Sequence, residues 1–136
     1  MLKGHCLCGA VRFEATGKPL WVVHCHCESC RRATSAPMAT YVGFRAAQVS
    51  WTGQAPKIFA SSGGVERGFC ARCGSPMCYV GERWPGEIHL FAASFEDPAA
   101  LVPRAHVNVA EQIPWLRLAD GLRRYATTAE EGPPLA

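Results

Sequence analysis

Eight cysteines and their spacing limit what this chain can fold into. Seven of them form three clusters with the patterns Cys-x-Cys, Cys-x-Cys-x-x-Cys and Cys-x-x-Cys, which present several thiolates to one point, as a metal ion requires. An even number of cysteines is also compatible with four disulfides. The first residues do not resemble a secretory signal, however, and reducing compartments rarely keep disulfides. We therefore predict metal binding in a cytoplasmic protein.

Length and charge limit the number of domains and the kinds of partner that this protein can have. The chain has 136 residues, the usual size of one domain, and no apolar stretch approaches the roughly 18 residues of a membrane-spanning helix. The formal net charge of +3 is small and the basic residues are spread out, so we expect neither a nucleic-acid partner nor a membrane. We predict one metal-binding β domain over residues 1–126 and a flexible tail over residues 127–136.

Short β-like segments run along most of the chain. Residues 9–16 alternate between apolar and polar positions, and apolar runs at 19–24 and 38–44 suggest two more strands. Further strands are expected at 48–52, 57–62, 65–70, 76–80, 86–94 and 104–109. Helical signals are limited to short turns at 28–34 and 97–101, the second with Asp97 as N-cap. The pattern predicts a mainly β fold, an antiparallel sandwich or a partly open barrel.

The segment CARCG at 70–74 has the spacing of a zinc knuckle. Two residues between Cys70 and Cys73 let both sulfurs face one ion, and Gly74 allows the positive φ that such a turn often needs. A structural zinc takes four ligands. Cys6 and Cys8 are the natural partners, because side chains at i and i+2 of a strand share a face. Four thiolates would tie the N-terminal strand to a loop about sixty residues later.

The stretch HCHCESCRR at 24–32 supplies a second set of ligands. Cys25, Cys27 and Cys30 are three thiols within six residues, and three protein ligands with a vacant fourth position are typical of catalytic zinc. Two alternatives remain open on spacing alone. His24, His26 or Cys78 could close this site and make it structural. The eight cysteines could also be divided differently, into one set of Cys6, Cys8, Cys25 and Cys27 and another of Cys30, Cys70, Cys73 and Cys78.

Five other residues have both functional and structural interpretations. Arg31 and Arg32 directly follow the second cluster, and guanidinium groups bind carboxylates with paired hydrogen bonds. They are candidates for holding an acidic substrate, with a solvated pair of surface charges as the alternative. Cys78 lies in an apolar segment and is expected to be a small core residue. His89 and His106 lie in strand-like segments and are expected to be core histidines rather than ligands.

Three cysteine-containing segments occur in series: GHCLCGAVRF at 4–13, HCHCESCRR at 24–32 and GFCARCGSP at 68–76. They are accompanied by WTG at 51–53, SFEDPAAL at 94–101, His106, PW at 114–115 and DGL at 120–122. In this order and at these separations, they resemble the glutathione-dependent formaldehyde-activating enzyme family, which includes the centromere protein V type domains. The resemblance covers residues 3–125.

This resemblance implies an Mss4-like, zinc-stapled antiparallel β fold with few short helical turns. It also implies two zinc ions, a structural one on Cys6, Cys8, Cys70 and Cys73 and a catalytic one on Cys25, Cys27 and Cys30. The implied reaction joins formaldehyde to glutathione, the co-substrate, and gives S-hydroxymethylglutathione. It is classed with the carbon–sulfur lyases because the reverse reaction cleaves that bond.

We therefore expect a zinc-dependent carbon–sulfur lyase that forms or cleaves an adduct of glutathione with formaldehyde or a related aldehyde. Arg31 and Arg32 become candidates for binding a glutathione carboxylate. The alternative is a non-catalytic zinc β module that binds a small thiol or a protein partner, because function lies in the site rather than in the fold. Methionine sulfoxide reduction would need a nucleophilic cysteine outside the zinc sites. Only Cys78 is spare, and its apolar neighbours are expected to raise its pKa.

Overall fold

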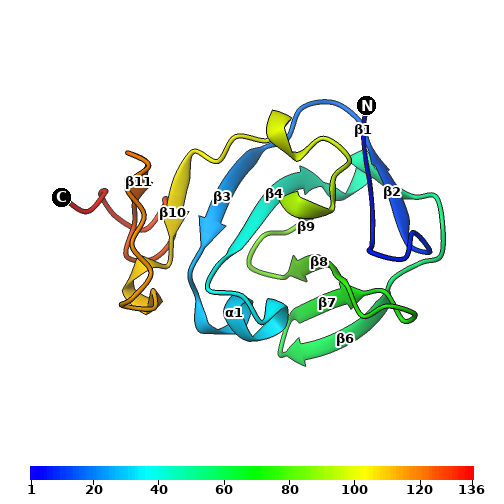
Figure 1. Ribbon diagram of the computed structural model, residues 1–136, viewed down its shortest axis with the longest axis horizontal. Coiled ribbons are helices and arrows are strands. Elements are labelled where there is room, and N and C mark those ends of the chain that lie inside the picture. Colours follow the sequence, from blue (N-terminus) through cyan, green and yellow to red (C-terminus); the bar gives the residue numbers. More distant parts are fainter. The chain divides into compact units, whose positions relative to one another are not determined.

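The structure is a computed structural model that describes all residues, 1–136. It contains eleven strands, one α-helix and four short 3-10 turns (Figure 1). The chain forms two compact units, a first unit of Met1–Trp21 with Val42–Val102 and a second unit of Val22–Tyr41 with Pro103–Ala136. The prediction of a mainly β fold is confirmed. The predicted division into a domain over 1–126 and a flexible tail stays a prediction.

A three-stranded antiparallel sheet begins the first unit. Its order is β1-β2-β5, formed by Leu2–His5, Arg12–Ala15 and Val49–Trp51. Alternation along β2 buries Phe13 and Ala15 on one face. The Phe13 ring packs edge-to-face on the rings of Trp51 and Phe95, with centroid distances of 5.9 and 4.9 Å. This aromatic group forms one part of the core of the first unit.

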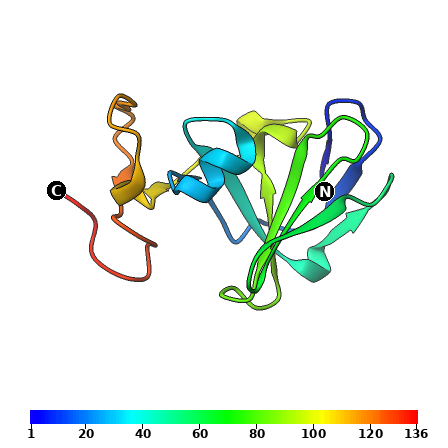
Figure 2. The same ribbon diagram turned by 90° about the horizontal axis from the view of Figure 1, so that it is seen from below.

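The second sheet of the first unit is an antiparallel series in the order β9-β8-β7-β6. These strands span Glu87–Phe91, Pro76–Gly81, Val65–Phe69 and Lys57–Ser62. Strands β6 and β7 form a hairpin, green in Figure 2, whose turn contains Gly63 and Gly64. Met77 and Leu90 are fully buried, whereas the edge strand β6 is largely exposed. The loop between β7 and β8 contains Cys70 and Cys73.

The second unit is built around strands β3 (Trp21–Cys25) and β10 (Ala105–Val107). Strand β10 pairs in parallel with β3 and also with β11 (Arg123–Arg124), so the pairing in this unit differs from the antiparallel expectation. Parallel pairing is possible because long connections separate these strands in the sequence. The helix α1 (Glu28–Thr34) follows β3, and β4 (Ala39–Arg45) starts in this unit and ends in the first.

Sequence patterns predicted the positions of most strands and helices, but several predicted end residues were wrong. The turn predicted at 28–34 is α1. The strand expected at 86–94 ends at Phe91 and continues as the turn η2 (Ala92–Ser94). The strand expected at 104–109 ends at Val107, because Asn108 adopts a left-handed conformation with φ of 56°. The turn at 97–101 is η3 (Pro98–Ala100), although the Asp97 side chain makes no capping hydrogen bond.

The elements that sequence patterns missed are short: β1, β11, η1 (Ala46–Gln48) and η4 (Val109–Glu111). None of the helices has the length and apolar character that crossing a membrane requires.

We expect Gly4→Ala to destabilise the first unit. Gly4 is buried in β1, opposite Phe13, and an added Cβ would overlap the Phe13 ring and the backbone oxygen of Ser94. Overpacking of this kind costs about 1–3 kcal/mol of unfolding free energy. Gly63→Ala is the matched control, since a Cβ there meets nothing within 4 Å. Thermal unfolding would test this expectation, and equal melting temperatures for the two variants would contradict it.

Candidate metal centres

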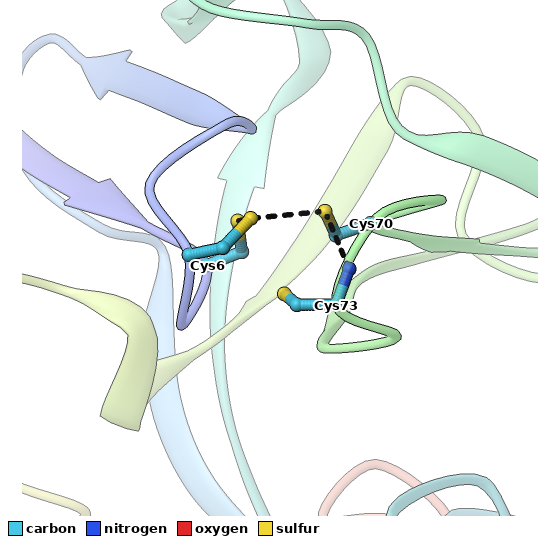
Figure 3. Close-up of side chains that lie close together, drawn as sticks. Cys6, Cys70 and Cys73 are labelled. Carbon is cyan, nitrogen blue, oxygen red and sulfur yellow. Dashed lines mark hydrogen bonds between the residues drawn. The ribbon is translucent and has the colours of Figure 1, made fainter.

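Two loops of the first unit bring four thiols together. Cys6 and Cys8 lie in the loop after β1, and Cys70 and Cys73 lie in the loop between β7 and β8. Figure 3 shows the sulfur atoms of Cys6, Cys70 and Cys73 turned toward a common point. All four Sγ atoms lie within 4.8 Å of one another, with 3.6 Å between Cys6 and Cys8 and 3.8 Å between Cys8 and Cys70. A tetrahedral zinc–thiolate site, with Zn–S bonds of about 2.3 Å, requires sulfur separations of about 3.8 Å.

The knuckle loop is shaped by its own backbone. The Gly74 N–H donates to the Cys70 carbonyl at 2.8 Å, and the Cys70 N–H donates to the Ser75 carbonyl at 2.9 Å. Gly74 has the expected positive φ, 78°, and the Cys73 N–H donates to the Cys70 sulfur at 3.4 Å. A backbone N–H thus already points at a sulfur atom in this loop. Such donors stabilise thiolates over neutral thiols.

The N-terminal pair is held in a turn rather than in a strand. Strand β1 ends at His5, so the shared strand face expected for Cys6 and Cys8 is not the geometry that brings them together. Instead, the Gly9 N–H donates to the Cys6 carbonyl at 3.1 Å, and the Val11 N–H donates to the Cys6 sulfur at 3.3 Å. This turn resembles the Cys70–Gly74 loop in two features. Each contains a glycine with positive φ, here Gly9, and each directs a backbone N–H at a cysteine sulfur.

Ser75 connects the two loops of this cluster. Its Oγ lies 3.1 Å from the Cys73 sulfur and accepts the Leu7 N–H at 3.1 Å. Hydrogen bonds from the Ser75 side chain and backbone lower the pKa of Cys73 to about 5. The Ala10 N–H lowers the pKa of Cys8, but the neighbouring thiols outweigh it and raise that pKa to about 11. Four thiols this close cannot all ionise without a cation, so the donor set fits a metal ion.

A second group of thiols occupies the junction of β3 and α1 in the second unit. Cys25 ends β3, Cys27 is the N-cap of α1 and Cys30 lies in its first turn. Their Sγ atoms lie within 4.8 Å of one another, at 3.5 Å between Cys25 and Cys30 and 2.9 Å between Cys27 and Cys30. The shorter separation would have to widen by roughly 0.9 Å around a zinc ion. The thiols of Cys27 and Cys30, together with burial, raise the pKa of Cys25, so this triad also favours a cation.

Each sulfur of the triad accepts a hydrogen bond from an N–H or O–H group. Asn108 Nδ2 donates to Cys25 at 3.2 Å, the Tyr41 hydroxyl donates to Cys30 at 3.3 Å, and the Cys30 N–H donates to Cys27 at 3.3 Å. Asn108 makes this bond from a left-handed backbone conformation, which costs a non-glycine residue energy. Sequence reasoning missed Asn108 and Tyr41. The sequence gives no signal for Tyr41, and the only signal for Asn108 is the tolerance of asparagine for positive φ.

The two groups are made of separate residues. The structure brings Cys6, Cys8, Cys70 and Cys73 together in one group and Cys25, Cys27 and Cys30 in another. Cys78 lies in β8, is 3% exposed and belongs to neither group. Burial raises the pKa of Cys78 to about 11, which makes it a poor nucleophile.

Buried histidines form a hydrogen-bonded chain beside the triad. Asp120 Oδ2 accepts from His106 Nε2 at 2.8 Å, and His106 Nδ1 lies 2.8 Å from His26 Nε2. The carboxylate can only accept, so in neutral His106 the proton is on Nε2 and Nδ1 accepts the His26 Nε2–H. His26 Nδ1 is then a buried acceptor without a partner. Burial is the main cause that lowers the pKa of His26 to about 4, and its proximity to His106 lowers it further.

This chain fixes the segment that carries the triad. His26 stands between Cys25 and Cys27 and is fully buried, as is His106. The His24 ring stacks on His106 at a centroid distance of 4.8 Å, and His24 Nδ1 lies 2.7 Å from Thr40 Oγ1. His24, His106 and Asp120 also form a group of metal-type donors. The His106 and Asp120 atoms already share a hydrogen bond, and the expected core role of His106 fits its burial.

The two candidate arginines of α1 differ in their surroundings. Arg32 is exposed and bonds to Glu28, four residues earlier, with an NH2–Oε1 distance of 3.0 Å. Arg31 is half-buried, and its Nε is buried without a hydrogen-bond partner. Of the two, Arg31 therefore has a guanidinium nitrogen left for another group, whereas Arg32 has the surroundings of an ordinary surface charge.

Comparison with known proteins finds relatives of this chain. Residues 1–111 match the family described as glutathione-dependent formaldehyde-activating enzyme. A Halomonas elongata protein provisionally given that name is 31% identical over 129 residues, which cover 87% of this chain and 81% of that protein. An uncharacterised lyase of Schizosaccharomyces pombe is 34% identical over 78 residues, 57% of this chain and 56% of that protein.

The fold has a counterpart among solved structures. The crystal structure of a Rhodobacter sphaeroides protein matches 90% of this chain and 98% of that chain, with a TM-score of 0.60 and 20% sequence identity. This likeness shows a shared fold. The family match spans all eight cysteines and most of the chain. The chain therefore belongs to the glutathione-dependent formaldehyde-activating enzyme family.

Proposed function

We propose that this protein is a zinc-dependent carbon–sulfur lyase. It forms or cleaves the adduct of glutathione with formaldehyde, S-hydroxymethylglutathione, or the adduct of a related aldehyde. The observation that carries the proposal is the group of three thiols, Cys25, Cys27 and Cys30, with Cys27 partly exposed. Three protein ligands are typical of catalytic zinc, where the fourth position is left for a reactant. The names of the relatives, a formaldehyde-activating enzyme and a lyase, support the same class of reaction.

The reaction needs neither an oxidant nor a reductant. In the forward direction the glutathione sulfur bonds to the aldehyde carbon, and the thiol proton ends on the former carbonyl oxygen. Zinc held by the triad supplies a Lewis acid that lowers the pKa of a thiol or polarises a carbonyl. Asn108 and Tyr41 donate to two of the triad sulfurs and so disperse their negative charge. Holding both reactants in one orientation removes much of the entropic barrier.

The four-thiol group is assigned a structural zinc. Its ligands come from two loops, two of its sulfurs belong to the buried Cys6 and Cys70, and its separations fit a closed tetrahedron. Metal binding at such a site contributes directly to the free energy of folding.

Substitution of one cysteine in each group separates the two roles. Cys70→Ser is expected to lower the thermal stability of the protein strongly, because it removes a ligand of the structural zinc. Cys27→Ser is expected to leave a folded protein with one zinc instead of two and with weaker glutathione binding, because the thiol loses its metal partner. Zinc content, thermal unfolding and calorimetric titration of glutathione would be measured for both variants and for the wild type.

The same measurements can contradict the assignment. If Cys27→Ser lowers the melting temperature as much as Cys70→Ser, the division into structural and catalytic zinc is wrong. If the wild type holds two zinc ions and does not bind glutathione, the non-catalytic zinc module becomes the better description.

Ser75→Ala is expected to make the structural zinc more sensitive to acid. Ser75 lowers the pKa of Cys73, so its removal raises that pKa and lets protons compete with zinc at a higher pH. The pH midpoint of zinc release should rise by about half a unit to one unit, the size expected for one lost hydrogen bond to a charged group. A chromogenic chelator in a pH titration would report the release. A midpoint equal to that of the wild type would show that the hydroxyl does not stabilise the thiolate.

Two substitutions of Asn108 separate its backbone role from its hydrogen bond. Asn108→Gly keeps the positive φ accessible but removes the donor to Cys25, so zinc affinity at the second site should fall about tenfold or more, with little change in melting temperature. Asn108→Ala should lose the same affinity and additionally about 1 kcal/mol of unfolding free energy. Chelator competition and thermal unfolding would measure both effects. Unchanged zinc affinity in Asn108→Gly would leave Asn108 a role in the turn only.

A further inference from the structure

A cavity of about 440 Å³ lies in the second unit, and neither Arg31 nor Arg32 lines it. Its wall is formed by residues between Val109 and Leu118 and by Arg124 of β11. The volume falls within the range of about 300–1,000 Å³ that is typical of small-molecule sites.

The cavity is lined by two cations and no anion. Arg117 and Arg124 both line it, and the other lining residues are apolar or amide. Neither guanidinium takes part in an ion pair in the structure. Two like charges at one cavity repel each other, and an anion placed between them removes that cost. Guanidinium groups bind carboxylates with paired hydrogen bonds, so the charge pattern fits a ligand with two carboxylates.

Gln112 adds a polar group that has no partner in the protein. Its Nε2 donates to the Leu116 carbonyl at 2.7 Å, which fixes the amide plane, and its Oε1 is buried without a hydrogen bond. An unsatisfied buried acceptor is costly, and a ligand N–H would satisfy it. The cavity therefore offers two sites for carboxylates and one acceptor for an amide or ammonium group, which is the functional-group pattern of a small peptide.

The cavity wall adjoins the triad through one short turn. Val109 lines the cavity, and Asn108, the residue before it, donates to the Cys25 sulfur. On the other side, Arg124 pairs with His106 on β10, and His106 pairs with His24 on β3. Two strand spacings place the Cα of Arg124 roughly 10 Å from that of His24. An extended tripeptide spans about the same length.

We infer that this cavity binds the carboxylates of the glutathione peptide, with Arg117 and Arg124 as their partners and Gln112 as acceptor of a peptide N–H, while the thiol extends toward the triad. The identity of the ligand rests on the proposed function. The inference assigns the substrate's charges to this cavity rather than to Arg32, whose guanidinium is bonded to Glu28.

The test uses S-methylglutathione, which carries both carboxylates and no free thiol, so that binding does not depend on the triad. Full-length wild type and Cys27→Ser should bind it with equal affinity in calorimetric titration. Arg117→Gln and Arg124→Gln should each weaken binding about tenfold or more, as expected when a charged hydrogen-bonded pair is lost. Arg123→Gln, at the neighbouring position of β11 and outside the cavity lining, is the matched control and should bind like the wild type.

Trp115 gives a second readout. It is the one tryptophan of the second unit, is 69% exposed and lies between Pro114 and Leu116, which line the cavity. S-methylglutathione should change the tryptophan emission of the wild type but not that of Trp115→Phe.

Three results would overturn the inference: no saturable binding by the wild type, equal losses in Arg123→Gln and the two cavity variants, or a loss confined to Arg31→Gln. A protein that binds S-methylglutathione through Arg117 and Arg124 but shows no activity with glutathione and formaldehyde would refute the proposed function and leave the inference standing.

Discussion

Four sulfur atoms meet between two loops of the first unit, Cys6 and Cys8 from one and Cys70 and Cys73 from the other. Strand β1 has four residues, of which Gly4 alone is buried, so a bound ion between these loops would add a tie that the strand's own packing does not supply. Both loops direct backbone N–H groups at sulfur. These backbone donors stabilise thiolates, and a bound cation would offset the repulsion that remains between the four sulfur atoms.

The two thiol groups share a ligand chemistry and differ in construction. The first joins loops far apart in the sequence and has four members, so an ion there would serve as a cross-link. The second comes from one short segment, Cys25 to Cys30, where a strand end meets a helix start, and an ion there would cross-link nothing distant. Its distant contacts are instead hydrogen bonds to sulfur, from Tyr41 and Asn108. This is the construction expected where the metal is held for reactivity rather than for stability.

Local patterns in the sequence predicted what is local in the structure. The α1 turn and the ligand spacing within each cluster follow from contacts between residues a few positions apart, so spacing alone locates them. The chain from His26 through His106 to Asp120 depends on the parallel register of β10 with β3, across some eighty residues. No periodicity encodes that register, and β10 and β11 are too short to produce a pattern. The same reason hid Asn108, which reaches Cys25 only because β10 stops one residue earlier.

The turn η4 and its flanking residues link the triad to the neighbouring cavity. Asn108 before the turn donates to Cys25, Glu111 within it accepts the Glu28 N–H at the start of α1, and Gln112 after it lines the cavity. A triad of thiols alone offers no basis for choosing one thiol over another, since any small thiol reaches an open metal position. Discrimination must come from groups that contact the rest of the ligand at a fixed distance from the sulfurs. In the proposed enzyme, the turn bonded to the strand end, to the helix start and to the cavity wall would set that distance, so thiol selectivity and metal geometry would depend on the same few residues.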